Sequence, residues 1–394
     1  MSASARPSPH PLPDVNALAR DLDALRKELD ALRGPADVLH LRLLGALSWL
    51  LLLTGLALSV FGFNPLSPIL MALASATRWM IVAHHTAHGA LDGIAGVPAR
   101  WTSAHFAQGF WRWLQWPDWI EAAAWKREHN QLHHAYTNEQ ADPDLVESQM
   151  RWLRDSGWPM PLRYLTAWLL AATWRWLYYA PNTSACLVEA SRAREDAVAL
   201  IDSAPSQRPW NPFTPVGKRL WLHSWLPYAA FQFGLLPALL LPFGVRIWAI
   251  GLAHAVVADV LTNLHTFIVI VPNHAGEDLV RWTDRGRGKG TWYLRQILSS
   301  CNYHTGNPLG DWLQGWLNYQ IEHHLWPDMT PRQYTAAAPR VREICAKHGI
   351  PYVQESLWRR VAKMLRIMTG RATMLRPDQV HVGEAVALVS DSAA

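Results

Sequence analysis

The chain has 394 residues, half of them apolar, and a formal net charge of +5. Its mean hydropathy is nevertheless near zero, which excludes a bundle made almost entirely of membrane spans and predicts a few spans joined by large polar segments. The sequence has no Lys/Arg run of the kind that binds nucleic acid, so no nucleic-acid partner is expected. Its three cysteines are scattered without a CxxC pair, so neither a disulfide framework nor a cysteine zinc site is expected.

The first 41 residues are expected to form a polar tail followed by an amphipathic helix. Residues 1–13 are rich in Pro and Ser and lack the apolar core of a signal peptide. Apolar side chains then recur at alternating intervals of three and four, at Val15, Leu18, Leu22, Leu25, Leu29 and Leu32. This spacing is typical of a coiled coil or of a helix with one apolar face. It predicts a helix lying on the membrane or on its own domain, with a homodimer through residues 15–33 as the alternative.

Four segments are apolar and long enough to cross a ~30 Å hydrocarbon core as helices. They form two hairpins, within residues 42–83 and 218–271, and comprise residues 43–63, 66–83, 220–242 and 247–271. Arg78 lies near the end of the second segment and is expected to reach the membrane interface with its charged head. Residues 163–179 are expected to form an interfacial helix that Arg175 interrupts.

Two large polar segments, residues 84–217 and 272–394, are expected to form a helical cap outside the bilayer. Lys and Arg are crowded in these segments and before the first span, whereas the short turns near Pro65 and Phe243 carry almost none. By the positive-inside rule, both termini and the cap should face the cytosol. Residues 203–215 are expected to be a Pro-rich linker, and the final residues a disordered tail.

Histidines gather in three clusters, all in the predicted cap or at its border. The clusters comprise His84, His85 and His88, then His129, His133 and His134, and finally His323 and His324. In the first two clusters a pair of histidines is four residues apart, so on a helix both rings lie on one face. His134 is turned by about 100° from His133 and can reach a second metal ion.

The number of clustered imidazoles exceeds the needs of one tetrahedral zinc ion. Imidazole is a good ligand for iron, zinc, copper and nickel, and two metal ions with open positions fit the clusters better. Carboxylates that commonly orient ligand imidazoles stand beside the clusters, at Glu128, Asp142, Asp144 and Glu322.

The three clusters resemble the histidine boxes of the membrane fatty acid desaturase family. HHTAHG resembles its first box and EHNQLHHAYTNEQADPDL its second. NYQIEHHLWPDM resembles the third box in the variant with Gln in place of the first His, which is typical of front-end and acyl-lipid desaturases. The similarity runs from about residue 43 to about residue 360, in the order two spans, two boxes, two spans, third box.

The resemblance implies an all-α membrane protein whose four transmembrane helices carry a cytosolic cap with a di-iron site. When the family's ligand positions are carried over to the matching residues of this sequence, the implied iron ligands are His84, His88, His129, His133, His134, His323 and His324. The family has one more ligand after the last span, for which His274 is preferred over His265. Gln320 is a possible weak or water-mediated ligand. His85 is a possible ligand but fits better as a residue that contacts a ligand.

The resemblance also implies O2 as co-substrate and electrons from a ferredoxin or a cytochrome b5. Some relatives carry a fused cytochrome b5 domain with an HPGG heme motif, but this N-terminus has only His10-Pro11-Leu12. A separate electron-transfer protein is therefore expected. The Gly-rich basic run at residues 285–290 lacks the spacing of a phosphate loop and is interpreted as a flexible turn, with docking of an acidic electron carrier as a second role.

Several further polar residues admit two interpretations. Asp259 and Asn263 share a helix face within the fourth span, where they either line the acyl tunnel or satisfy an interhelical hydrogen bond. His223 and His254 are expected to be structural, and His105 and His304 are weak candidates for the site.

Oxygen-dependent desaturation of a lipid acyl chain is the function that these features predict. A related di-iron hydroxylase or other monooxygenase is the alternative, because the ligand boxes alone barely separate the two outcomes. A membrane metal transporter or metal-storage protein is a remote alternative, since it needs ligands along a transmembrane path, whereas these histidines cluster at span ends and in polar segments.

Overall fold

The computed structural model describes residues 13–118, 120–193 and 209–379, and over these residues the fold is helical. Its only β features there are two isolated bridges, Val280 with Leu375 and Asn302 with Gln354. The predicted N-terminal tail up to residue 12, the C-terminal tail from residue 380 and residues 203–208 of the predicted linker at 203–215 lie outside the described residues. The prediction of an all-α protein is therefore confirmed for the described part of the chain.

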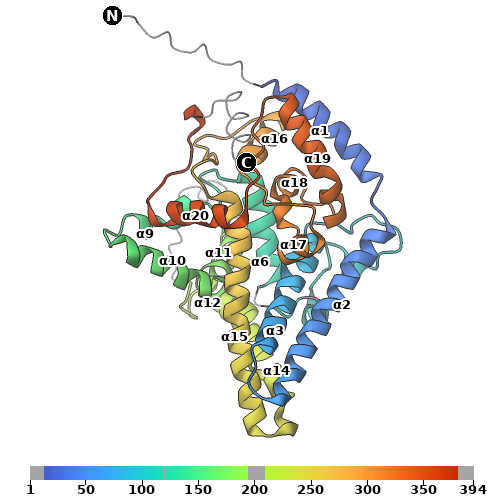
Figure 1. Ribbon diagram of the computed structural model, residues 1–394, viewed down its shortest axis with the longest axis vertical. Coiled ribbons are helices and arrows are strands. Elements are labelled where there is room, and N and C mark those ends of the chain that lie inside the picture. Colours follow the sequence, from blue (N-terminus) through green and yellow to red (C-terminus); the bar gives the residue numbers. More distant parts are fainter. Residues whose placement is uncertain (1–12, 119, 194–208, 380–394) are drawn as a thin grey trace, which may run out of the picture.

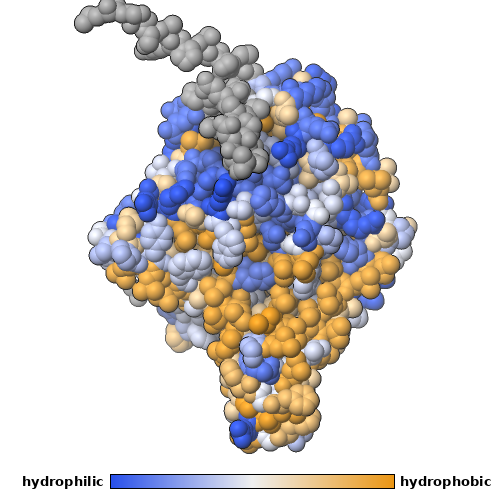
Figure 2. Space-filling view, viewed as in Figure 1, coloured by the Kyte–Doolittle hydropathy of each residue, from blue (hydrophilic) through white to orange (hydrophobic). Residues whose placement is uncertain are grey.

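Four helical segments are long and apolar enough to cross a membrane, as the sequence predicts. They comprise Pro35–Phe61, Leu66–Ala87, Pro215–Phe243 and Val245–His274. The first span contains α2 (Pro35–Leu58), and the second begins as α3 (Leu66–Ala76), which packs between α2 and α15 (Val245–Ile270) of the fourth span. The four spans converge at the lower end of the view in Figure 1, where Figure 2 shows an almost continuous apolar surface.

The third span is built from short α-helical, π-helical and 3-10 turns. These are α12 (Pro215–Leu220), η7 (Trp221–Trp225), α13 (Leu226–Ala229), η8 (Ala230–Leu235), α14 (Leu236–Ala238) and η9 (Leu241–Phe243). Leucines on its outer face are half exposed, among them Leu222, Leu235 and Leu239. Such side chains gain nothing from water, so this face suits contact with lipid.

A polar cap covers the opposite end of the spans (Figure 2). Its longer helices are α1 (Val15–Asp30), α10 (Met160–Trp174), α11 (Ala180–Ala193), α16 (Lys289–Leu298), α19 (Pro331–Lys347) and α20 (Leu357–Thr369). Its shorter elements include α5 (Arg112–Gln115), α6 (Ala122–Trp125), η5 (Lys126–His133), α7 (His134–Tyr136), α8 (Val146–Gln149), α9 (Arg151–Arg154), η6 (Arg175–Tyr179), α17 (Pro308–Leu313), η11 (Leu317–Tyr319) and α18 (Gln320–Leu325).

The N-terminal helix α1 is part of this cap, which agrees with the interpretation of a helix lying on its own domain. Its leucine seam (Leu18, Leu22, Leu25 and Leu29) is at most 2% exposed, because α1 packs against α16 and α19 (Figure 1). Arg26 adds a bidentate ion pair with Asp328, with N–O distances of 2.8 and 2.9 Å. The seam is thus buried within one chain and is not available for the membrane or for a homodimer through residues 15–33.

Two arginines also differ from prediction, because each finds a carboxylate inside the protein. Arg78 is 2% exposed and donates to both carboxylate oxygens of Asp118, at 2.7 and 2.9 Å, instead of reaching the membrane interface. The side chain of Arg175 does not lie at the membrane interface; it is buried and forms an ion pair with Asp259. A buried charge is tolerated when it is paired and hydrogen-bonded, and both arginines meet that condition.

Candidate metal centre

Two groups of histidines are assembled inside the cap, next to the ends of the spans. The first comprises His84, His88, His129 and His323, and the second His133, His274 and His324; within each group, one nitrogen from every ring lies within 4.8 Å of the others. His134 lies between the groups, with its Nε2 3.3 Å from Nε2 of His129 and its ring centroid 4.3 Å from that of His324. Residues from all three sequence clusters thus meet in one place.

Irregular helical turns carry three of these histidines and directly precede two more, His84 and His134. The second span widens into a π-helix, η2 (Thr77–Ala83), immediately before α4 (His84–Ala87). His129 and His133 lie within the π-helix η5, and His134 begins α7. His274 ends the 3-10 turn η10 (Val271–His274), where the fourth span leaves the membrane region. The π-helical turns η2 and η5 are wider than an α-helix, and such turns are rare and frequently occur at functional sites.

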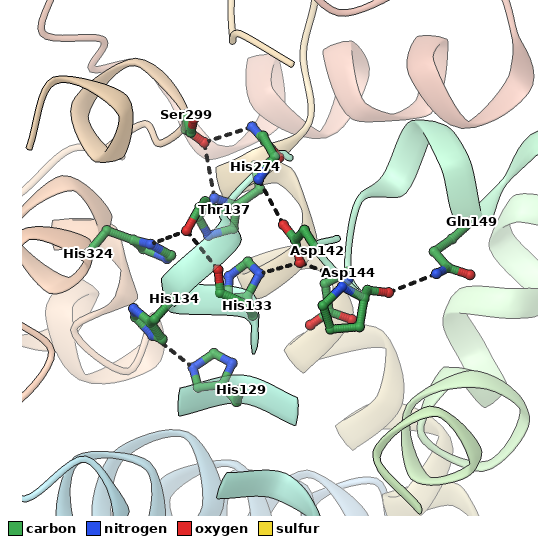
Figure 3. Close-up of polar contacts among 12 residues, drawn as sticks. His129, His133, His134, Thr137, Asp142, Asp144, Gln149, His274, Ser299 and His324 are labelled. Carbon is green, nitrogen blue, oxygen red and sulfur yellow. Dashed lines mark hydrogen bonds and ion pairs between the residues drawn. The ribbon is translucent and has the colours of Figure 1, made fainter. Parts of the chain in front are cut away.

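Hydrogen bonds on the outer side of the second group orient its rings (Figure 3). Nδ1 of His133 lies 3.0 Å from Oδ1 of Asp142, and Nδ1 of His274 lies 3.1 Å from the carbonyl oxygen of Ser299. Nδ1 of His324 lies 2.9 Å from Oε1 of Gln296. An Nδ1–H that donates outward leaves Nε2 with a lone pair facing the centre, which is the usual arrangement of a metal-binding imidazole.

The same arrangement occurs in the first group. Nδ1 of His323 lies 3.1 Å from the hydroxyl of Tyr334, while its Nε2 lies 3.1 Å from Nε2 of His84. The indole of Trp125 stacks on the ring of His129 at a centroid distance of 4.5 Å and supports that ring from one side.

A metal ion fits this donor set. In the two groups and His134, four buried ring nitrogens have no hydrogen-bond partner among the described residues: Nε2 of His88, Nδ1 of His129, Nδ1 of His134 and Nε2 of His324. Outside the groups, Nε2 of His85 and Nδ1 of His40 have none either. Burying an unpaired polar atom costs roughly 1–3 kcal/mol, so several of them in one place need a compensating ligand. Imidazole-rich sites suit iron, zinc, copper and nickel, and a metal ion would use these lone pairs.

Burial also keeps the rings in the protonation state that a metal requires. Desolvation, followed by the charges of neighbouring histidines, lowers the pKa of His88, His129, His134, His323 and His324. A neutral imidazole is the form that binds a metal ion. His133 differs, because the charge and hydrogen bond of Asp142 outweigh its desolvation and raise its pKa.

The four carboxylates expected beside the boxes differ in their positions. Asp142 is hydrogen-bonded to His133, as expected. Glu128 and Asp144 lie within 4.8 Å of a nitrogen of His129, and burial, followed for Glu128 by the charge of Asp144, raises the pKa of both carboxyls. Glu322 points elsewhere, since it accepts from Asn302 and Tyr352 at 2.8 Å each, and burial raises its pKa to about 7.

Of the remaining candidate ligands, one belongs to a histidine group, one borders a group and two lie outside both groups. His274 joins the second group, whereas Nε2 of His265 lies 2.7 Å from the carbonyl oxygen of Leu313, outside both groups. His85 belongs to neither group, and its Nδ1 lies 2.8 Å from the carbonyl oxygen of Ile81. Gln320 borders the second group, with its amide Nε2 2.8 Å from Nε2 of His274.

The minor candidates lie away from the two groups. His105, His223 and His304 are exposed. His254 lies within the spans, where Nδ1 is 2.8 Å from the hydroxyl of Ser59 and Nε2 accepts from the amide of Asn64.

Asp259 and Asn263 satisfy interhelical hydrogen bonds. Asp259 is paired with Arg175 and accepts from the hydroxyl of Tyr228 at 2.6 Å, and Asn263 accepts from the amide of Arg175 at 3.0 Å. Neither residue lines the apolar cavity beside the histidines, so the tunnel-lining interpretation is replaced by the interhelical one.

That cavity joins the histidines to the apolar ends of several helices. Four histidines line it, namely His84, His129, His133 and His274. Its apolar wall comes from η2, α8, α10, α15, α20 and nearby turns, and includes Trp79, Met150, Leu170, Trp174, Phe267, Ile270 and Met368. A cavity with this lining can hold a hydrocarbon chain against both histidine groups.

Sequence reasoning missed the residues that orient the rings from outside. Gln296 and Ser299 come from α16 and the turn after it, and Tyr334 comes from α19. No spacing relates them to the boxes. The one available signal is a Gln on the buried face of the amphipathic helix α16, where Gln296 is 2% exposed.

Comparisons with known proteins agree with this architecture. The sequence pattern of the family described as fatty acid desaturase matches residues 47–356. The NADPH-dependent stearoyl-CoA 9-desaturase of Mycobacterium tuberculosis (strain H37Rv) is 28% identical over 279 residues, which are 65% of this chain. The Delta(5) fatty acid desaturase A of Dictyostelium discoideum is 23% identical over 309 residues, which are 74% of this chain and 60% of that protein.

A third relative covers less of the chain. Human fatty acid desaturase 3 is 34% identical over 134 residues, which are 34% of this chain and 26% of that protein. The chain spans 61% of the length of the mycobacterial relative. Because the family pattern covers more than half of the chain, including all three histidine clusters, the chain belongs to the fatty acid desaturase family.

Proposed function

We propose that this protein introduces a double bond into a lipid acyl chain in an O2-dependent reaction. The observation that carries the proposal is the apolar cavity, because its wall includes rings from both histidine groups together with side chains of the membrane-facing helices. Each buried methylene contributes about 0.8 kcal/mol to binding.

Two iron ions are the proposed cofactor. His84, His88, His129 and His323 would hold one ion, His133, His274 and His324 the other, and His134 lies between them. Gln320 is placed to contribute weakly beside His274, and His85 and His265 are left out of the ligand set. Bound iron supplies the O2-dependent oxidation: two hydrogens leave adjacent methylene carbons, and with two electrons and two protons the O2 becomes two waters.

The chain's own residues position the substrate and exclude water. Trp174, Phe267 and Leu170 line the cavity and restrict the path of a flexible chain, so that one pair of carbons lies against the histidines. Asp142, Ser299 and Gln296 hold their imidazoles in fixed orientations, which keeps the metal positions fixed during turnover.

The membrane orientation follows from the charge distribution. The cap, with both termini and the histidine groups, lies on the cytosolic side, because Lys and Arg are crowded in it and sparse in the turns at the other end of the spans. Electrons come from a separate protein of the ferredoxin or cytochrome b5 type. The functional regions are a tail and amphipathic helix (1–41), two membrane hairpins (42–83 and 218–271) and two cap segments (84–217 and 272–394).

A single substitution tests the proposal. His133→Ala removes a ring that lines the cavity and belongs to the second group, so desaturation and iron loading should both be lost while the protein still inserts into the membrane. The matched control is His223→Ala, which removes an exposed histidine outside both groups. Iron is measured on the purified protein and products by lipid profiling of an expressing host. Normal activity in His133→Ala contradicts the assignment.

A lipid hydroxylase is the second candidate, since the same two histidine groups can serve either reaction. Mass spectrometry of the product separates the two, by loss of two hydrogens or gain of one oxygen. Transport of a metal ion would require ligands along a transmembrane path, and the histidines instead surround one cavity at the ends of the spans.

A further inference from the structure

An exposed basic loop adjoins residues that contact the histidine groups. Residues 283–289 are all exposed and connect Trp282 to helix α16. Most charges around the loop are neutralised locally. Lys289 is paired with Asp23 at 2.6 Å, Arg295 contacts Glu139 and Asp284 at 3.0 and 3.1 Å, and Arg281 is paired with Glu147 at 2.7 Å.

Two cations are left over. Arg285 and Arg287 are exposed and have no ion pair within residues 13–118, 120–193 and 209–379. Arg285 is held in place by the ring of Tyr136, with its guanidinium carbon 5.0 Å from the ring centroid. Within the described residues, the loop therefore presents two exposed arginines without a salt bridge to solvent, and Tyr136 positions one of them, Arg285.

The loop is also bonded to the residues that orient the histidines. The indole N–H of Trp282 donates to the hydroxyl of Ser299 at 2.8 Å. The carbonyl oxygen of the same Ser299 lies 3.1 Å from Nδ1 of His274. Tyr136, beneath Arg285, lies two residues after His134 in the short helix α7, and the intervening Ala135 is exposed. On this side the exposed Ala135 directly follows the buried His134, so surface residues adjoin the histidine groups.

We infer that this loop and the adjoining surface of α7 are the docking site for a small acidic protein that carries one electron at a time. The inference rests on the proposed function, which requires electrons from outside the chain. Electron transfer between proteins becomes steeply slower with distance, so the carrier must dock where the buried groups come nearest to the surface. Unneutralised cations at that place attract and orient an acidic partner, mainly by accelerating its association.

Charge reversal on the loop tests the docking site. The variant carries Arg285→Glu together with Arg287→Glu. The matched control carries Arg342→Glu and Arg359→Glu, which reverse two exposed arginines on α19 and α20 and change the net charge equally. The probe is an acidic plant-type ferredoxin, whose binding to the full-length protein in nanodiscs is measured at two ionic strengths.

The loop variant should bind the ferredoxin about tenfold more weakly at low salt, and the difference from wild type should shrink at high salt. The control should bind as the wild type does. Reduction of the metal centre by dithionite, followed by its absorbance, should be the same in all three proteins, because a small reductant needs no docking surface.

Three results overturn the inference: equal binding by the loop variant and the wild type, equal weakening in the control, or no measurable binding to the wild type. These results are independent of the product. If the protein makes double bonds but the loop variant binds normally, the docking site is wrong and the proposed function stands. If binding depends on the loop but the product is hydroxylated, the proposed function is wrong and the docking site stands.

Discussion

Two of the clusters of buried polar side chains in the described residues differ in how well their acceptor atoms are satisfied. In the histidine groups, several ring nitrogens have no hydrogen-bond partner among the described residues. The second cluster lies between η6, the third span and α15. There the carboxylate of Asp259 forms an ion pair with Arg175 and accepts hydrogen bonds from Tyr228 and Trp176. The cluster around Asp259 completes an interhelical contact, whereas the histidine cluster has lone pairs left for a ligand.

The largest expected effect separates two histidines that are neighbours in space. His323→Ala removes a ring of the first group and should lower bound metal from about two ions per chain toward one, with desaturation falling below detection. His85→Ala removes a ring that belongs to neither group and should keep both ions. Metal analysis of the two purified variants is the measurement. Equal metal loss in both variants would show that the division between His323 and His85 is wrong.

The Asp259 cluster should respond in stability and not in metal content. Asp259→Ala leaves the buried guanidinium of Arg175 without its carboxylate, and breaking a buried pair on one side costs about 3–5 kcal/mol. We expect a lower yield of folded protein and a lower midpoint of thermal unfolding in detergent. The metal content of the fraction that remains folded should equal that of the wild type. A folded but metal-depleted Asp259→Ala protein would mean that the two clusters are coupled.

A smaller effect is expected for a residue that only orients a ligand ring. Gln296→Leu removes the nearer of two oxygens beside Nδ1 of His324, the other being the hydroxyl of Thr137 at 3.1 Å, while keeping the volume of the side chain nearly the same. Loss of such a partner weakens metal affinity about 10–100-fold. A chelator competition titration measures this change. Gln140→Leu, which alters an exposed glutamine, is the control and should titrate as the wild type does.

The smallest effect is expected when the whole ion pair is replaced. Changing Arg175→Met and Asp259→Leu together removes both charges, and apolar replacement of a complete buried pair is often neutral or stabilising. The thermal midpoint of the double variant should therefore lie close to that of the wild type and well above that of Asp259→Ala. A double variant as unstable as Asp259→Ala would show that the hydrogen bonds of Tyr228 and Trp176 carry the stability of this cluster.

The sequence by itself determined the four spans and the three histidine clusters. Both are local patterns: an apolar run long enough for a bilayer, and histidines repeated at helical spacing, are visible without knowing the fold. The preference for His274 over His265 agrees with the geometry, since His274 ends the fourth span beside the second group. Of the four carboxylates near the boxes, Asp142 is the one that bonds a ring of the same box.

Only the tertiary structure decided how the histidines divide into two groups and what covers each apolar or charged surface. Arg26 meets Asp328 across 302 positions, and Arg78 meets Asp118 across 40. The leucine seam of α1 pairs with α16 and α19, although its spacing alone fits a second chain or a membrane equally well. Periodicity shows that a face must be buried but does not name its partner, because the partner depends on which distant segments pack together.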